Sequence, residues 1–114
     1  MFLQGSSYNL PIQIKDLKGK IITNADVTEA SFTIGNITKD YKNDGTGEVE
    51  FDYVENSWII PLTQEETFAL QKGLVQWQAR FIFNNGLVDG TKPKSENVFE
   101  SINKTIFKKE VENA

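Results

Sequence analysis

The stretch GLVQWQARFIF, residues 73–83, decides the fold class, because apolar and polar side chains alternate along it. Every second position from Val75 to Phe83 is apolar, and the positions between them carry Gln76, Gln78 and Arg80 before Ile82. A period of two is typical of a strand with one face in a core and the other in water. The pattern therefore predicts a half-buried strand of about eleven residues.

Shorter runs of the same kind lie on both sides of this stretch. Strands are expected at residues 10–14, 21–22, 30–34, 49–53, 58–60, 87–88 and 97–103. Turn sequences separate the runs, at residues 16–19, 43–47 and 54–57. Asn85 and Gly86 supply the positive φ values of a tight hairpin, so the chain after them is expected to fold back on the long strand.

One short helix is predicted between the strands, at residues 64–71. Thr63 and Glu66 have the spacing of a capping box, in which each side chain accepts from the other residue's amide. Pro61 is expected to end the strand before the helix, and Gly73 to end the helix in the left-handed conformation.

These elements predict an all-β fold, an antiparallel β-sandwich of immunoglobulin-like size with about seven strands. A small β-barrel is the alternative. A chain of 114 residues is long enough to bury one core, so a single domain spanning 1–114 is expected. Its ends, 1–7 and 108–114, are expected to be flexible.

Composition excludes several classes of function. The chain has no Cys and no His, which removes thiol nucleophiles, the commonest general base and the main imidazole metal ligand. Its net charge is −4 and Arg80 is its one Arg, which argues against a nucleic-acid groove. No run resembles a signal peptide or a membrane span. We expect no enzymatic activity, no cofactor, no metal, no nucleic acid and no membrane partner.

Carboxylates are the catalytic groups that remain. Glu48, Glu50 and Asp52 alternate along one predicted strand, about 6.5 to 7 Å apart, a separation that an inverting glycosidase could use. A solvated acidic face that discourages edge-to-edge aggregation is the favoured interpretation.

The loop at residues 40–48 is a candidate calcium site. Asp40, Asn43, Asp44 and Glu48 surround two glycines there, and Ca²⁺ prefers oxygen ligands. The spacing does not match the EF-hand loop, so an ordinary polar turn is favoured.

Two groups of residues are candidate partner contacts. Gln76, Gln78 and Arg80 lie on the polar face of the long strand, where Gln and Arg can hydrogen-bond a neighbouring subunit; a merely wet sheet face is the favoured interpretation. Trp58 and Tyr41 are the candidate platform of a carbohydrate-binding or adhesin-like module, although core packing is favoured for the aromatic residues.

Several stretches carry a family resemblance: LPIQIKD (10–16), VTEASFTIG (27–35), WIIPLTQEETFAL (58–70), QARF (78–81), the Asn-Gly turn at 85–86 and ESI (100–102). They are strand and turn patterns, and no catalytic signature is among them. Through these stretches nearly the whole chain, from about residue 9 to residue 106, resembles tail or baseplate modules of siphophages and prophages, in particular the N-terminal domain of the upper baseplate protein.

The resemblance implies a non-enzymatic β-sandwich that docks on the phage tail and takes part in virion assembly or host-receptor attachment. The implied partners are other tail or baseplate proteins and further copies of the chain. The implied location is the virion tail, after synthesis in the bacterial cytoplasm. Residues 1–7 and 104–114 are expected to become ordered on a partner. The carbohydrate-binding module is the second hypothesis, with a host-surface glycan as its partner.

Overall fold

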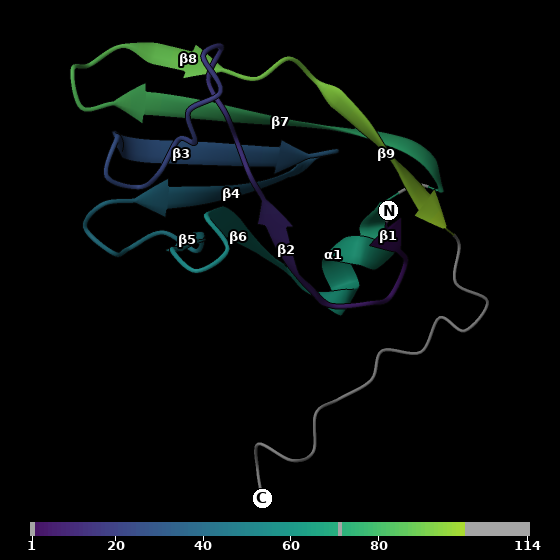
Figure 1. Cartoon of the computed structure of the whole chain (residues 1–114). Helices are drawn as coiled ribbons and strands as arrows, with labels where there is room; N and C mark the ends of the chain where they lie inside the picture. The colour runs from purple at the N-terminus through teal and green to yellow at the C-terminus, as the bar shows by residue number, and fades with distance from the viewer. Residues whose placement is uncertain (1, 71, 100–114) are drawn as a thin grey trace, which may run out of the picture.

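The chain was analysed as a computed structural model, which describes residues 2–70 and 72–99. Two β-sheets lie face to face, and one short helix lies at one end of them (Figure 1). The fold is a two-layer β-sandwich and not a closed barrel, which confirms the predicted class.

The large sheet has the strand order β1-β9-β7-β3-β4, and β8 pairs with β7 alongside β9. Its strands pair antiparallel except β1 with β9, which are parallel. The bounds are β1 (Phe2–Leu3), β3 (Val27–Ile34), β4 (Ile37–Lys42), β7 (Gly73–Phe83), β8 (Val88–Gly90) and β9 (Lys94–Phe99).

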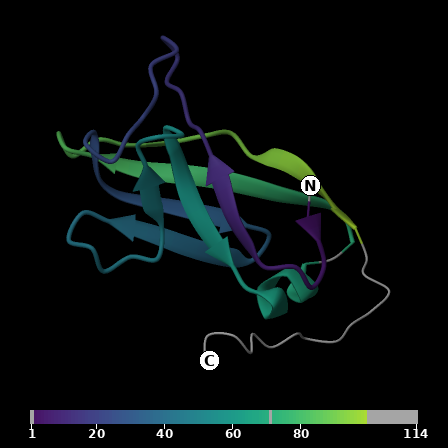
Figure 2. The same cartoon turned by 60° about the horizontal axis from the view of Figure 1, so that its bottom comes forward.

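The small sheet has the order β2-β6-β5 and covers one face of the large sheet (Figure 2). Its strands are β2 (Tyr8–Ile12), β6 (Ser57–Leu62) and β5 (Glu50–Asp52). Both pairings are antiparallel. Residues 21–22 do not form the predicted strand: Ile21 makes only an isolated bridge to Lys15.

The long strand forms within its predicted bounds, as β7. Its neighbour β3 begins earlier than the alternation at residues 30–34 indicates, because a bulge lies between Val27 and Glu29. Val27 and Ala30 are three residues apart and both are buried, so the extra residue of the bulge restores the inward direction of Val27.

Strand β4 was not predicted, nor was the two-residue β1. In β4 the inward positions are Ile37, Lys39 and Tyr41, and the buried lysine interrupts the expected apolar alternation. The hairpin with β3 turns at Gly35, whose φ is 60°. Because one inward position of this edge strand is charged, the alternation of apolar and polar residues does not predict the strand.

The two predicted hairpins are present. At the β7–β8 turn the Phe83 N–H donates to Leu87 O and the Gly86 N–H to Phe83 O, both at 2.9 Å. Gly86 has a φ of 87°, whereas Asn85 is not in the left-handed region, so the turn needs one glycine and not two special residues. The β5–β6 turn closes at Asn56, with a φ of 52°.

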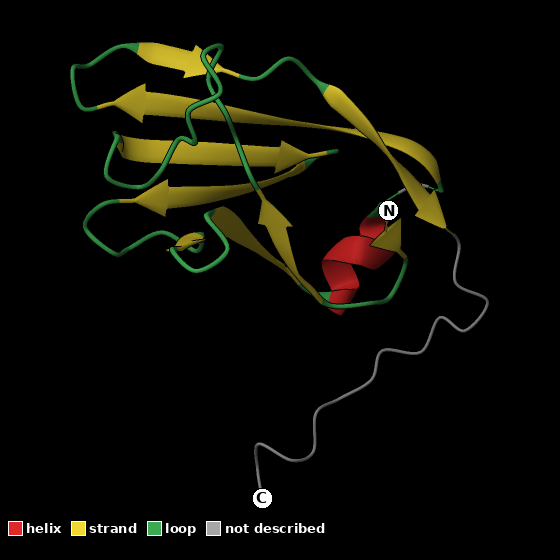
Figure 3. Cartoon of the chain, in the orientation of Figure 1, coloured by secondary structure: helices red, strands yellow, loops and turns green. Residues whose placement is uncertain are grey.

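The helix α1 (Gln64–Ala69), drawn in red in Figure 3, is the one helix among the described residues. It begins with the predicted capping box. Thr63 Oγ1 accepts from Glu66 N at 3.1 Å, and Glu66 Oε1 accepts from Thr63 N at 2.9 Å. The predicted C-terminus is wrong, because the helix ends at Leu70 in an extended conformation and Gly73 instead begins β7.

Pro61 does not end the preceding strand, as was predicted. It lies within β6 and is paired with Asn9 of β2. Strand β5 pairs only with residues 57–59 of β6, so the other edge of β6 is unpaired at Pro61 and requires no N–H there.

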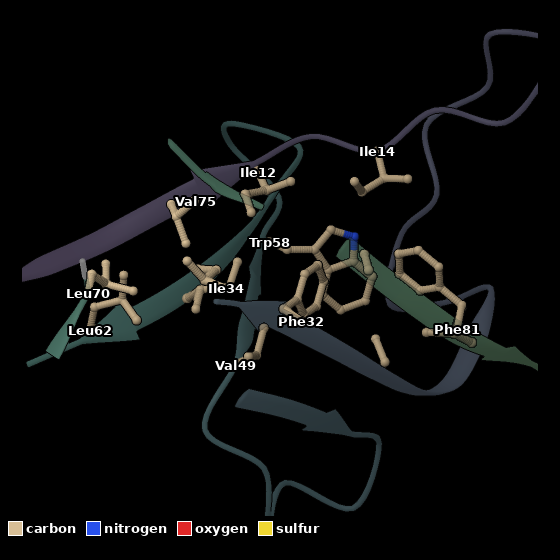
Figure 4. Packing of buried hydrophobic residues seen from close by; sticks show 14 of the residues in the cluster. Ile12, Ile14, Phe32, Ile34, Val49, Trp58, Leu62, Leu70, Val75 and Phe81 are labelled. Atoms are coloured by element: carbon tan, nitrogen blue, oxygen red, sulfur yellow. The ribbon is translucent and has the colours of Figure 1, made fainter. Parts of the chain in front are cut away.

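Three aromatic rings form the centre of the core (Figure 4). Trp58 of β6 lies 5.6 Å from Phe32 and 5.8 Å from Phe81 of the large sheet, measured between ring centroids. Phe32 and Phe81 are 5.9 Å apart and perpendicular. Trp58 Nε1 donates to Ile22 O at 3.1 Å, so the polar atom of this fully buried side chain is also satisfied.

The beginning of the chain is attached to α1. Gly5 N donates to Thr67 Oγ1 at 2.9 Å, and Thr67 Oγ1 lies 2.8 Å from Ser6 O. Gln4 Nε2 donates to Leu70 O at 2.7 Å. These contacts place residues 4–6 against the helix, and the predicted flexibility of residues 1–7 stays a prediction. The other predicted flexible end, 108–114, and residues 100–103 of the last predicted strand lie outside the described residues.

Replacing Trp58 tests the role of the central rings. We expect Trp58→Ala to lower the free energy of unfolding by about 3–5 kcal/mol, because it leaves a cavity between both sheets. Urea unfolding followed by circular dichroism measures the change. Leu17→Ala, at a fully exposed turn residue, is the control and should change stability by less than about 0.5 kcal/mol. Equal effects of the two substitutions would contradict a core centred on Trp58.

Candidate functional site

The candidate site is the face of the large sheet that points away from the small sheet, here called the outer face. Strands β8, β7, β3 and β4 lie side by side across it (Figure 1). The strand register arranges its residues in three rows: Lys42, Glu29, Ile82 and Val88; Asp40, Ser31, Arg80 and Gly90; and Thr38, Thr33 and Gln78.

The structure places the three predicted polar residues of β7 on this face. Gln76 and Arg80 are exposed, and Gln78 is half-buried with its Nε2 donating to Thr91 O at 2.9 Å. The ion pairs of the described residues do not include Arg80. The outer face therefore presents Arg80 among neutral hydrogen-bonding groups and three further charged residues, Glu29, Asp40 and Lys42.

An open depression of about 360 Å³ lies in the outer face. Residues of β3, β4, β7 and β8 line it, among them Glu29, Ser31, Asp40 and Arg80. Ser31 is paired on one side with Asp40 and on the other with Arg80, so a small residue separates two long or charged ones. The hollow therefore has a carboxylate on one wall and the guanidinium on the other.

Apolar side chains border the outer face at the β7–β8 hairpin. Ile82 and Val88 are opposite each other in the register and are 37% and 56% exposed, and Leu87 in the turn is 66% exposed. Isolated exposed apolar residues are common, but three together beside a polar sheet face are the composition of a protein contact surface.

The prediction of Trp58 as a surface contact or sugar platform is wrong, because its side chain is 0% exposed. Tyr41 is half-buried and its ring lies 5.1 Å from that of Trp58 in an edge-to-face arrangement. Both residues fill the core, in agreement with the favoured interpretation of the aromatic residues. Trp77 is also half-buried, and its ring lies 5.6 Å from Lys94 Nζ.

The three alternating carboxylates have separate surroundings. Glu48 Oε2 binds Lys39 Nζ at 3.0 Å, and Asp52 Oδ1 accepts from Val54 N at 2.9 Å to shape the β5–β6 turn. Glu50 is exposed at the start of β5. Two of the three thus stabilise the local fold, and the described residues do not bring them together around a cleft.

The predicted calcium loop is organised by its own hydrogen bonds. Asp44 Oδ1 accepts from Thr46 N at 2.9 Å and from Thr46 Oγ1 at 2.7 Å, which lowers the pKa of Asp44. Glu48 turns to Lys39, and Asp40 belongs to the outer face. Within residues 2–70 and 72–99, no three acidic residues are arranged to hold a metal ion.

An ion cluster around the buried Lys39 is the feature that the sequence did not reveal. Lys39 of β4 is 7% exposed, and its Nζ lies 2.8 Å from Glu66 Oε2 and 3.0 Å from Glu48 Oε2. The cluster joins the edge strand, the helix and the loop before β5. Glu66 also completes the capping box, so one carboxylate stabilises both the helix start and the strand edge.

The charges of the cluster stabilise one another. Burial alone would lower the pKa of Lys39, but its hydrogen bonds and charge interactions with Glu66 and Glu48 outweigh this and raise it. Burial would likewise raise the pKa of Glu66, yet the bonds from Lys39 and Thr63 lower it. Both partners therefore favour their charged forms near neutral pH.

Comparisons with known proteins were made with both the sequence and the fold. No protein-family model, no curated protein and no solved structure matches this chain. In the part of the chain that the structure describes, no helix has the length and apolar character to cross a bilayer. These comparisons therefore indicate no function, and a function is to be inferred from the positions of the chain's own residues.

Acid should release the stabilisation that Glu66 supplies. Its pKa is lower in the folded chain than its ordinary value of 4.5, so this stabilisation is full above that pH and is lost as the pH falls below it. We expect Glu66→Gln, which can retain the capping box, to cost about 1–3 kcal/mol at neutral pH and to flatten the loss of stability in acid. Urea midpoints measured across the acid range test this.

The matched control is Glu65→Gln, one residue earlier in the same helix and exposed. Its acid profile should follow that of the unmodified chain. Coincident profiles for Glu66→Gln and the unmodified chain would contradict a stabilising ion cluster.

Proposed function

We propose that this chain is a non-enzymatic structural module of a phage or prophage tail or baseplate. It is made in the bacterial cytoplasm, docks onto other tail proteins and takes part in virion assembly or attachment to the host. The resemblance of its strand and turn sequences to baseplate modules supports the proposal, and so does the β-sandwich fold that the resemblance implied.

The outer face is the observation that carries the docking role. Four neighbouring strands present Gln, Ser, Thr and Arg side chains there beside Glu29, Asp40 and Lys42, with exposed aliphatic residues at one border. Neutral amides and hydroxyls both donate and accept hydrogen bonds, and removing them from water costs less than removing charges. Together with the charged residues of the face, these groups can form hydrogen bonds and ion pairs with another folded protein.

The roles of the acidic residues also favour a structural module. Glu48 and Glu66 hold Lys39, and Asp52 shapes a turn. Two of the three carboxylates first considered for catalysis, Glu48 and Asp52, thus stabilise the local fold. The carbohydrate-binding alternative loses its platform, because Trp58 lies in the core and Tyr41 packs on it.

The location can be tested directly in virus particles. Particles should be purified after prophage induction of the strain that encodes the chain, and probed with an antibody against it. We expect the chain in purified particles, with immunogold at the tail end. Its absence from intact particles, together with its presence in the soluble cell fraction, would contradict the proposed function.

A variant of the outer face tests the docking surface. Gln76→Glu combined with Arg80→Glu replaces a neutral and a cationic contact by negative charge, so we expect incorporation into particles to fall by at least about tenfold, corresponding to 1.4 kcal/mol or more of lost binding. Lys18→Glu, at the exposed turn of residues 16–19, is the control and should be incorporated normally. Equal incorporation of both variants would place the docking surface elsewhere.

A further inference from the structure

We infer that the outer face binds a second copy of this chain, through two reciprocal ion pairs between Arg80 of one copy and Asp40 of the other. The inference rests on the proposed function, because it uses the same face and names one of its partners. It follows from the register of β4, β3 and β7, which places Asp40 and Arg80 in one row of the outer face.

Arg80 and Asp40 lie in one row of the outer face, on either side of Ser31. Neighbouring strands are about 4.8 Å apart, so two strand spacings separate the backbones by about 10 Å. Within one chain the two charges do not form an ion pair: the ion pairs of the described residues include neither of them. Each charge is therefore available to a partner.

A two-fold axis parallel to β3 and lying over it satisfies both charges. This operation turns a second sheet face to face with the first and exchanges the positions of β4 and β7. Asp40 of the second copy then lies over Arg80 of the first, and the reverse pair forms on the other side of the axis. A contact of this kind is self-complementary and closed, as in most soluble dimers.

The surroundings of the row favour a close approach along this axis. Ser31 lies on the axis and is small, and the depression beside it leaves space for an incoming guanidinium next to Asp40. Glu29 also lies under the axis, opposite Glu29 of the second copy, with the cation Lys42 beside it in the register. The same operation places Lys42 of the second copy over Ile82, and Val88 lies outside the overlap because β4 is an edge strand.

The size of the face sets the strength of the contact. Three strands, β7, β3 and β4, overlap in this arrangement, and with up to eight residues each they cover about 14 by 26 Å, or roughly 370 Å² on each copy. Stable dimers commonly bury about 800 Å² on each side. We therefore expect a weak dimer that forms at high concentration and low salt, where exposed ion pairs are least screened.

Charge reversal tests the reciprocal pairing by sedimentation equilibrium over a range of concentrations. We expect the unmodified chain to dimerise, and Arg80→Glu and Asp40→Lys each to weaken the dimer by at least about tenfold. An equimolar mixture of the two variants should dimerise again, because each pair then joins opposite charges. The variant carrying both substitutions should also dimerise alone.

The control is Lys18→Glu, which changes the net charge as Arg80→Glu does but lies in the turn of residues 16–19, and should dimerise normally. Circular dichroism checks that each variant is folded. A monomeric unmodified chain at every concentration, or a mixture that does not recover, would overturn the inference. If the chain is nevertheless found in virus particles and needs its outer face to be there, the proposed function stands and the partner is a different tail protein.

Discussion

The contact of Trp58 with Phe32 and Phe81 is the constraint on which the rest of the structure depends. The three rings come from β6, β3 and β7, so they join the two sheets at their centres. Their packing fixes which face of each strand is inward, since moving any strand by one residue would turn its apolar side chains to the solvent. The outward direction of Gln78 and Arg80 is thus a consequence of the inward direction of Ala79 and Phe81. The surface that we propose for docking is set by the core behind it.

The edge of the large sheet depends on a different interaction. Strand β4 places Lys39 under the edge of the sandwich, where Glu66 and Glu48 neutralise it. An inward-pointing charge on an edge strand discourages pairing with strands of other molecules, because the charge would lose its partners or remain buried alone. The proposed role in an assembly would require contacts to be confined to particular surfaces. In this chain the edge is protected in this way while the outer face is left open.

Much of the fold could be predicted from local sequence. The alternation in residues 73–83 located β7, the hairpin turns at Gly86 and Asn56 were recognisable, and Thr63 with Glu66 identified the helix start. The predictions failed where a tertiary contact determined the outcome. Pro61 remains in a strand because that edge of β6 is unpaired there, so no backbone N–H is required. Strand β4 was not predicted because Lys39 occupies one of its inward positions. Trp58 could not be assigned to the core or surface by pattern, because either direction was compatible with its short run.

The sequence by itself determined the strand periods, the turns, the capping box and the polar stripe of Gln76, Gln78 and Arg80, because each depends on residues close together in the chain. Only the tertiary structure decided which strands are neighbours, and therefore that Ser31 separates Arg80 from Asp40 and that Lys39 meets both Glu48 and Glu66. These arrangements join residues from separate elements, and pairing across the sheet and between the layers is selected by the packing of the whole core. Charged residues that are far apart in the sequence thus come together on one face and in one ion cluster.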